Sequence, residues 1–259
     1  MLKLKRVIDM SNAYEKLLTL RCFDLHEATE IYGNENTAQS AILSLKKKGK
    51  AKSVKRNLYV IISLETHEPV SSPFEIASHI TKSAYVSHHS AFEYYGLTNQ
   101  IYTDIYVSSD ERFSSFDFDG RTYRYISSKS RKGIVSLRKL RVTDIERTLV
   151  DSIKDFSKIG GLEELKTCIS MITVIDENKV LEYLEEYDNG FLYKKTGYLI
   201  MNSEISGKFS QHFYELCKKK AQNSVRYLYE ELKTERAVYE KEWKLFVPAD
   251  NYTEDEIDV

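Results

Sequence analysis

The chain has 259 residues, of which 42% are hydrophobic and 12% aromatic, enough for two domains with a packed core and unlike a disordered protein. Three widely spaced cysteines, Cys22, Cys168 and Cys217, argue against a disulfide framework and against a zinc site. No apolar run approaches the ~20 residues that span a bilayer, and no signal-peptide core follows the first residues, so we expect a cytoplasmic protein without a membrane partner.

The net charge of −1 hides an uneven distribution of charge along the chain. Residues 1–64 carry twelve Lys and Arg against six Asp and Glu, and the remainder carries 26 against 33. Positive charge releases counterions from a nucleic-acid duplex, so the likeliest place for a nucleic-acid partner is the N-terminal end. The acidic charge of residues 65–259 predicts that this part of the chain has a function other than binding nucleic acid.

The N-terminal residues predict three short helices. Ser11 is expected to cap a first helix that runs to about Cys22, and the pair Asp24 and Glu27 is a capping signature for a second. After the turn at residues 33–35, a third helix is expected to begin at Asn36 as its cap, with Gln39 completing a capping box, and to end at Gly49. Two brief helices joined by a short glycine-containing turn are typical of a helix-turn-helix.

A basic hairpin is expected directly after the third helix. Val54 and the run 58–62 read as two strands, with residues 55–57 at the turn. This order indicates a winged helix-turn-helix, in which helix side chains reach base edges and wing side chains reach phosphates. The candidate DNA-binding residues are Thr37, Gln39, Ser40, Ser44 and Lys47 on the helix and Lys52, Lys55 and Arg56 in the wing. A competing interpretation is a solvated helix end, because the helix dipole favours lysines there with or without DNA.

The sequence predicts an α+β fold, with an N-terminal winged helix-turn-helix, a mixed α/β domain and a helix-rich C-terminal part. We expect a DNA-binding domain at 1–64, a linker at 65–73, an α+β domain at 74–202, a helical extension at 203–249 and an acidic tail at 250–259.

Within the second domain, helices are expected at 74–80 and 88–95 and strands at 84–86, 101–107 and 115–126, the last folded as a hairpin about Asp119-Gly120. Thr143 and Glu146 form a capping box for a helix that runs to about Phe156. From Gly160 onward the pattern predicts helices alone, including a long one from Ser224 to Phe246.

Candidate catalytic groups are few. His88 and His89 are adjacent on a helix and lack a further ligand at helical spacing, so one packed and one exposed imidazole is the expectation. The carboxylates of Asp104, Asp117 and Asp119 lie on or beside predicted strands, as in a metal-dependent nuclease, without a lysine at the close spacing such a site needs. We therefore expect no catalytic residue, metal or cofactor.

Two further features have structural interpretations. Arg147 and Asp151 are spaced as an intrahelical ion pair worth a few tenths of a kcal/mol. Trp243 and the segment 227–229 are interpreted as packing residues, because large aromatic side chains bury most of their surface.

Two segments, YVSHHSAFEYYGL at Tyr85–Leu97 and RVTDIERTLVDSI at Arg141–Ile153, together with the helix-turn-helix before them, resemble the AbiEi family. These are antitoxins and transcription regulators of bacterial type IV toxin–antitoxin (abortive infection) systems. The resemblance covers most of residues 10–200 and implies a winged helix that binds inverted repeats in its own promoter. It also implies a C-terminal domain that neutralises a nucleotidyltransferase toxin without a stable complex, and it carries over no catalytic residue.

Two other functions remain open. The first is a transcriptional repressor without a toxin partner, whose acidic C-terminal part binds another protein. The second is a metal-dependent nuclease that uses the strand aspartates. A nucleotidyltransferase gene immediately downstream would favour the antitoxin, and metal-dependent cleavage lost on Asp104→Asn would favour the nuclease.

Overall fold

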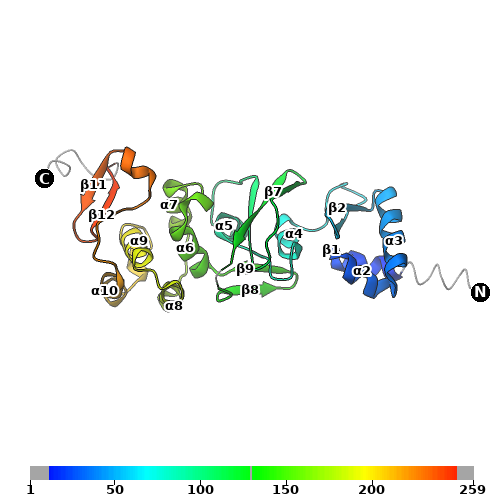
Figure 1. The fold of residues 1–259 in the computed structure, drawn as a ribbon, viewed down its shortest axis with the longest axis horizontal. Helices are drawn as coiled ribbons and strands as arrows, with labels where there is room; N and C mark the ends of the chain where they lie inside the picture. Colours follow the sequence, from blue (N-terminus) through cyan, green and yellow to red (C-terminus); the bar gives the residue numbers. More distant parts are fainter. Residues whose placement is uncertain (1–11, 129, 250–259) are drawn as a thin grey trace, which may run out of the picture. The chain divides into compact units, whose positions relative to one another are not determined.

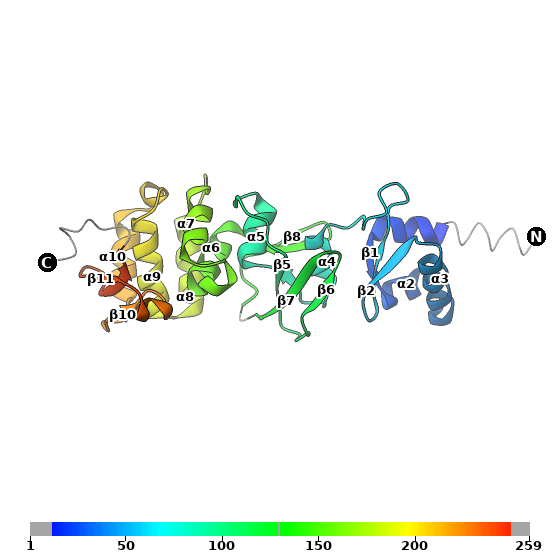
Figure 2. The same cartoon turned by 90° about the horizontal axis from the view of Figure 1, so that it is seen from above.

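The computed structural model describes residues 12–128 and 130–249 (Figures 1 and 2). Contacts divide the chain into two compact units, one made of residues 1–90 and 102–142 and the other of residues 91–101 and 143–259. The predicted linker 65–73 lies inside the first unit, and the domain boundaries of the sequence stay predictions. Ser11, the expected cap of the first helix, and the acidic tail 250–259 lie outside the described residues.

The first unit begins with a small helical body on a three-stranded antiparallel sheet of order β1-β3-β2. Its elements are helical residues 12–20, β1 (Cys22–Asp24), α2 (Leu25–Tyr32), α3 (Glu35–Lys47), β2 (Ala51–Lys55) and β3 (Leu58–Ile61). Apolar side chains from all three helices meet the sheet in one core, which contains Leu17, Phe23, Ala28, Ala38, Ile42 and Ile61. One face of the third helix, with Ala38, Ala41 and Ile42, is therefore a buried stripe.

Local capping signals decide where α2 and α3 begin. The Asp24 side chain accepts from the Glu27 amide and the Glu27 carboxylate accepts from the Asp24 amide, so this predicted capping box is confirmed. For α3 the expected cap was wrong: Asn34, not Asn36, accepts from the Thr37 amide. Gly33 has φ +73° and ends α2. Asn34 is the first residue after that glycine with a side chain that can cap a helix, so it becomes the N-cap of α3.

The expected first helix is too long by two residues. Arg21 has φ +62° and stops the helix at residue 20, and Cys22 begins β1, which pairs with β3. The basic hairpin is confirmed, with Arg56 and Asn57 between its two strands and Asn57 at φ +62°.

The rest of the first unit contains a six-stranded mixed sheet of order β6-β7-β5-β4-β9-β8. Its strands are β4 (Tyr85–Val86), β5 (Asp104–Ser109), β6 (Phe116–Phe118), β7 (Arg121–Ser127), β8 (Ile134–Leu137) and β9 (Leu140–Thr143). Helix α4 (Pro73–His79) packs against β4 and β5, and α5 (His88–Tyr95) follows β4 directly. The hairpin at Asp119-Gly120 is confirmed, and both turn residues have positive φ.

Two features of this sheet were not expected from the sequence. Strands β8 and β9 form at residues for which no element was predicted. Thr143 is the last residue of β9 and not a helix cap; Asp144 caps the next helix instead by accepting from the Arg147 amide at 2.8 Å. A β-branched residue suits a strand end, and a carboxylate suits the helix N-terminus.

Within the described residues, the second unit contains most of α5, five further helices and a small sheet. The helices are α6 (Ile145–Lys154), α7 (Leu162–Ser170), α8 (Glu177–Tyr187), α9 (Gly190–Met201) and α10 (Gln211–Lys220), with short 3-10 turns at Phe156–Lys158, Ser206–Lys208 and Glu231–Thr234. The sheet has the order β10-β12-β11 and contains β10 (Arg226–Tyr227), β11 (Ala237–Glu240) and β12 (Leu245–Pro248). The helices and β12 share one apolar core.

The predicted helix from Ser224 to Phe246 is therefore wrong, and residues 226–248 form strands and a 3-10 turn. β10 pairs in parallel with β12, and β11 pairs with it in antiparallel. Lys and Glu are frequent here and favour helix, but β11 contains Val238 and Tyr239 and β12 contains Phe246 and Val247, residue types that favour strands.

Trp243 is buried, as expected, and lies against α9. A methyl group added at Gly197 would come within 2.2 Å of the Trp243 ring, so the glycine is what permits this contact. The three cysteines are also buried and unpaired, and burial raises the pKa of each thiol.

Candidate nucleic-acid interface

The exposed side of α3 is the first part of the candidate interface. Of the five candidate positions on this helix, Thr37, Gln39, Ser40 and Lys47 are exposed and Ser44 is half-buried. At 3.6 residues per turn, Ser40 and Lys47 point directly away from the buried stripe, whereas the other three lie on its flanks. The helix therefore divides the candidates into a central pair and a set of flanking residues.

The same outward stripe includes two residues that the sequence analysis did not select. Asn36 is exposed and no longer needed as a cap, and the Leu43 side chain is 53% exposed. With Ser40 and Lys47 they follow the spacing i, i+4, i+7 and i+11, which we call the α3 stripe. The sequence feature that could have revealed this face is a leucine that shares one helix face with polar residues.

The candidates on α3 have local neighbours. The Gln39 amide donates to the Glu35 carboxylate at 2.8 Å on the same helix. The flanking residues Thr37 and Ser44, together with Ser40 of the central pair, line a hollow of about 600 Å³ beside residues 12–16 and the end of α2. Lys46 and Lys47 occupy the last turn of α3, where the helix dipole favours positive charge.

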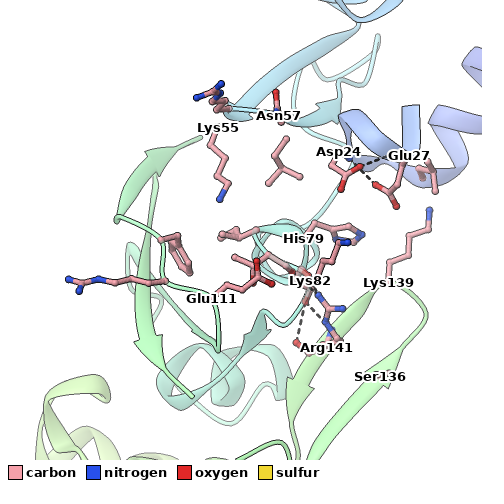
Figure 3. A pocket seen from close by; sticks show the side chains of 18 of the residues that line it. Asp24, Glu27, Lys55, Asn57, His79, Lys82, Glu111, Ser136, Lys139 and Arg141 are labelled. Carbon is pink, nitrogen blue, oxygen red and sulfur yellow. Dashed lines mark hydrogen bonds between the residues drawn. The ribbon is translucent and has the colours of Figure 1, made fainter. Parts of the chain in front are cut away.

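The three candidates in the β2–β3 hairpin differ in their surroundings. Lys52 and Arg56 are exposed. Lys55 is half-buried, and its ammonium lies 5.6 Å from the centre of the Phe113 ring. Figure 3 shows the Lys55 side chain extending from the hairpin into a pocket, toward the loop that carries Glu111. Burial lowers the pKa of Lys55, and the Glu111 carboxylate opposes that shift.

The second family-like segment contributes a buried polar network at the start of α6. Asp144 accepts from the Arg147 amide with one carboxylate oxygen and from the Tyr183 hydroxyl, at 2.6 Å, with the other. Lys179 lies 3.4 Å from the same oxygen of Asp144 and 3.8 Å from Glu146. These contacts join α6 to α8, so the segment has a structural role in the second unit.

The candidate catalytic groups have structural partners. Asp104 is paired with Arg124 at 2.5 Å, which raises the pKa of the arginine, and Asp117 accepts from the Thr122 hydroxyl at 2.6 Å. The expectation of one exposed histidine was wrong, because both His88 and His89 are buried. His88 is within hydrogen-bonding distance of the Ser87 hydroxyl, 2.9 Å, and His89 lies against the Tyr102 ring.

Within residues 12–128 and 130–249, no group of three or more His, Cys, Asp or Glu side chains is arranged to hold a metal ion. None of the helices described there combines the length and the apolar character of a membrane span.

Taken together, the fold is a mixed α+β architecture with several separate sheets. No protein-family model and no curated protein matches the sequence. Among solved structures, the chain is similar to the RV2827C protein from Mycobacterium tuberculosis, with a TM-score of 0.57 and 12% sequence identity. The similarity covers 87% of this chain and 85% of that one, so it extends over both units and supports the fold.

Proposed function

We propose that the chain is a DNA-binding transcription regulator whose residues 12–62 act as a winged helix-turn-helix. In this proposal α3 is the recognition helix and the β2–β3 hairpin is the wing. The observation that carries it is the α3 stripe: Asn36, Ser40, Leu43 and Lys47 form one outward face, exposed on the side opposite the core.

The chemistry of the stripe suits a major groove. Asparagine matches the donor and acceptor pattern of adenine, and lysine binds guanine or phosphate. Leu43 is exposed to solvent in the free protein. In a major groove its side chain could contact a thymine methyl group. Arg56, exposed at the hairpin turn, is placed to contact the DNA backbone or the minor groove.

We propose further that the protein is the antitoxin of a type IV toxin–antitoxin system. The support is the resemblance of residues 85–97 and 141–153 to the AbiEi family. The partners would be inverted repeats of its own promoter and a nucleotidyltransferase toxin, which the C-terminal domain neutralises. The network about Asp144 and Arg147 then shapes the second unit and is not itself the contact surface.

The DNA-binding proposal is tested on a duplex that carries the upstream inverted repeats. Arg56→Ala is expected to reduce the slope of log K against log salt by about one, because one phosphate contact is lost. Lys219→Ala, an exposed lysine of α10, removes the same charge and is expected to leave the slope unchanged. Equal slopes in the Arg56 and Lys219 variants would remove the wing from the proposal.

The antitoxin proposal is tested by co-expressing the full chain with the adjacent gene product. The double variant Ser40→Ala with Lys47→Ala is expected to lose repression and still rescue growth, because the stripe and the second unit have separate tasks. If the adjacent product is harmless by itself, the repressor without a toxin partner becomes the better description.

A further inference from the structure

The pocket of Figure 3 is a cleft of about 740 Å³ within the first unit. Its walls come from the β2–β3 hairpin, the C-terminal end of α4 with the residues after it, the loop after β5, and the β8–β9 hairpin. Three acidic side chains line it, Asp24, Glu27 and Glu111, against seven basic ones: Lys55, Arg56, Lys82, Arg112, Arg138, Lys139 and Arg141.

Two of the basic side chains, Arg141 and Lys139, donate hydrogen bonds to backbone carbonyls. The Arg141 guanidinium donates to the backbone carbonyls of Ala84, at 2.7 Å, and of Ser78 and Thr81, which lie at and after the end of α4. Lys139 donates to the Thr19 carbonyl. Arg141 and Lys139 therefore hold the walls of the cleft together.

The acidic side chains that line the cleft are fewer than the basic ones. Asp24 and Glu27 accept from each other's backbone amides in the capping box of α2. Glu111 faces Lys55 across the cleft and favours its charged form (Figure 3). Lys82, Arg112 and Arg138 are exposed at the rim, and no ion-pair or hydrogen-bond partner is found for them among the described residues.

Lys55, Lys82, Arg112 and Arg138 line one concave space, and like charges around such a space repel one another unless an anion enters it. Phosphate is the anion that best matches several Lys and Arg donors at once, because its oxygens accept charge-assisted hydrogen bonds in several directions. The cleft volume falls within the roughly 300–1,000 Å³ of small-molecule pockets.

We propose that this cleft binds a small molecule bearing two or more phosphate groups, held by Lys55, Lys82, Arg112 and Arg138. None of these four residues belongs to the α3 stripe, and Arg56 is the proposed DNA contact that also lines the cleft. The phosphate-binding proposal does not depend on the DNA-binding function.

The test is a calorimetric titration of the full chain with inorganic tripolyphosphate at low ionic strength. We expect saturable binding that Lys82→Ala with Arg112→Ala weakens by at least about tenfold, because two charge-assisted contacts are lost. The control, Lys219→Ala with Lys220→Ala, removes the same charge from exposed positions on α10 and is expected to change the affinity less than about twofold. Absence of saturable binding, or equal weakening in both variants, overturns the proposal.

A second measurement distinguishes a free phosphate ligand from the DNA backbone. If the cleft cations serve DNA, Lys82→Ala with Arg112→Ala lowers the salt slope of duplex binding by about two while wild type fails to bind tripolyphosphate, and the proposal is overturned. If DNA binding proves absent altogether, the proposed regulator fails while tripolyphosphate binding is still expected.

Discussion

Arg147 and Asp151 form an ion pair inside the second unit, with 2.8 Å between the guanidinium Nε and the carboxylate and side chains that are 2% and 4% exposed. The Tyr187 hydroxyl donates to the same carboxylate oxygen and accepts from the arginine at 2.9 Å. The guanidinium also lies 5.1 Å from the Tyr187 ring centre. The pair is thus a fully partnered buried network that joins α6 to α8.

Loss of one partner of this pair is expected to be costly. Arg147→Ala leaves the Asp151 carboxylate buried without its counter-charge, and we expect a loss of about 3–5 kcal/mol in the free energy of unfolding. The measurement is urea denaturation at pH 7. The matched control is Lys166→Ala, which breaks the more exposed pair with Glu163 and is expected to cost less than about 1 kcal/mol. Similar losses in the two variants would contradict a buried role.

Gly197→Ala is expected to destabilise the protein even though alanine favours helix. The new methyl group would come within 2.2 Å of the Trp243 ring, so α9 or the loop before β12 must move. We expect a net loss of about 1–3 kcal/mol, measured by thermal or urea denaturation. Gly207→Ala is the control, because no atom lies within 4 Å of its added methyl group. A gain in stability at Gly197 would mean that Trp243 is not held against α9.

Lys195 gives a pH-dependent prediction. Its side chain is buried, its ammonium lies 3.9 Å from the Phe156 ring centre, and burial lowers the pKa of Lys195 to about 8. An unfolded lysine titrates near about 10.4. Between these values the unfolded chain holds a proton that the native chain has released, so the free energy of unfolding rises with pH.

Lys195→Met removes the buried charge and is expected to stabilise the protein by about 1–3 kcal/mol at pH 7, after allowance for the lost ring contact. The gain should shrink as the pH rises from about 8 toward about 10.4, because the native wild type is then neutral. Unfolding free energies of both proteins across this range give the difference. A constant difference across the range would contradict the shifted pKa.

The sequence predicted best those features that depend on a few neighbouring residues. The capping box of Asp24 and Glu27 and the turn at Asp119-Gly120 are of this kind, since their hydrogen bonds and φ angles are local. The strands after residue 224 were missed because each has only two to four residues. Each is stabilised by hydrogen bonds to a neighbouring strand, which is brought alongside only when the chain folds. No local signal shows that a partner strand will be present.

The candidate interface was also predicted only in part, for two reasons. Asn36 was set aside as a helix cap, and the choice between Asn34 and Asn36 depends on where Gly33 ends the previous helix. Lys55 is a candidate DNA-binding residue by its charge and position, but charge counts alone do not show on which side of a hairpin a side chain lies. The packing of the hairpin against Phe113 decides that.

The α3 stripe leads to a prediction about sequence specificity. Asn36→Ala is expected to relax the preference at one base pair by about 1–3 kcal/mol, because a side chain at the centre of the exposed face can approach a base edge. Gln39→Ala is expected to have a smaller effect, since Gln39 lies on the flank and its amide is bonded to Glu35. Competition binding with operator variants that change one base pair at a time measures both. If Gln39→Ala relaxes specificity and Asn36→Ala leaves it intact, the helix approaches DNA by its flank and the stripe is not the reading face.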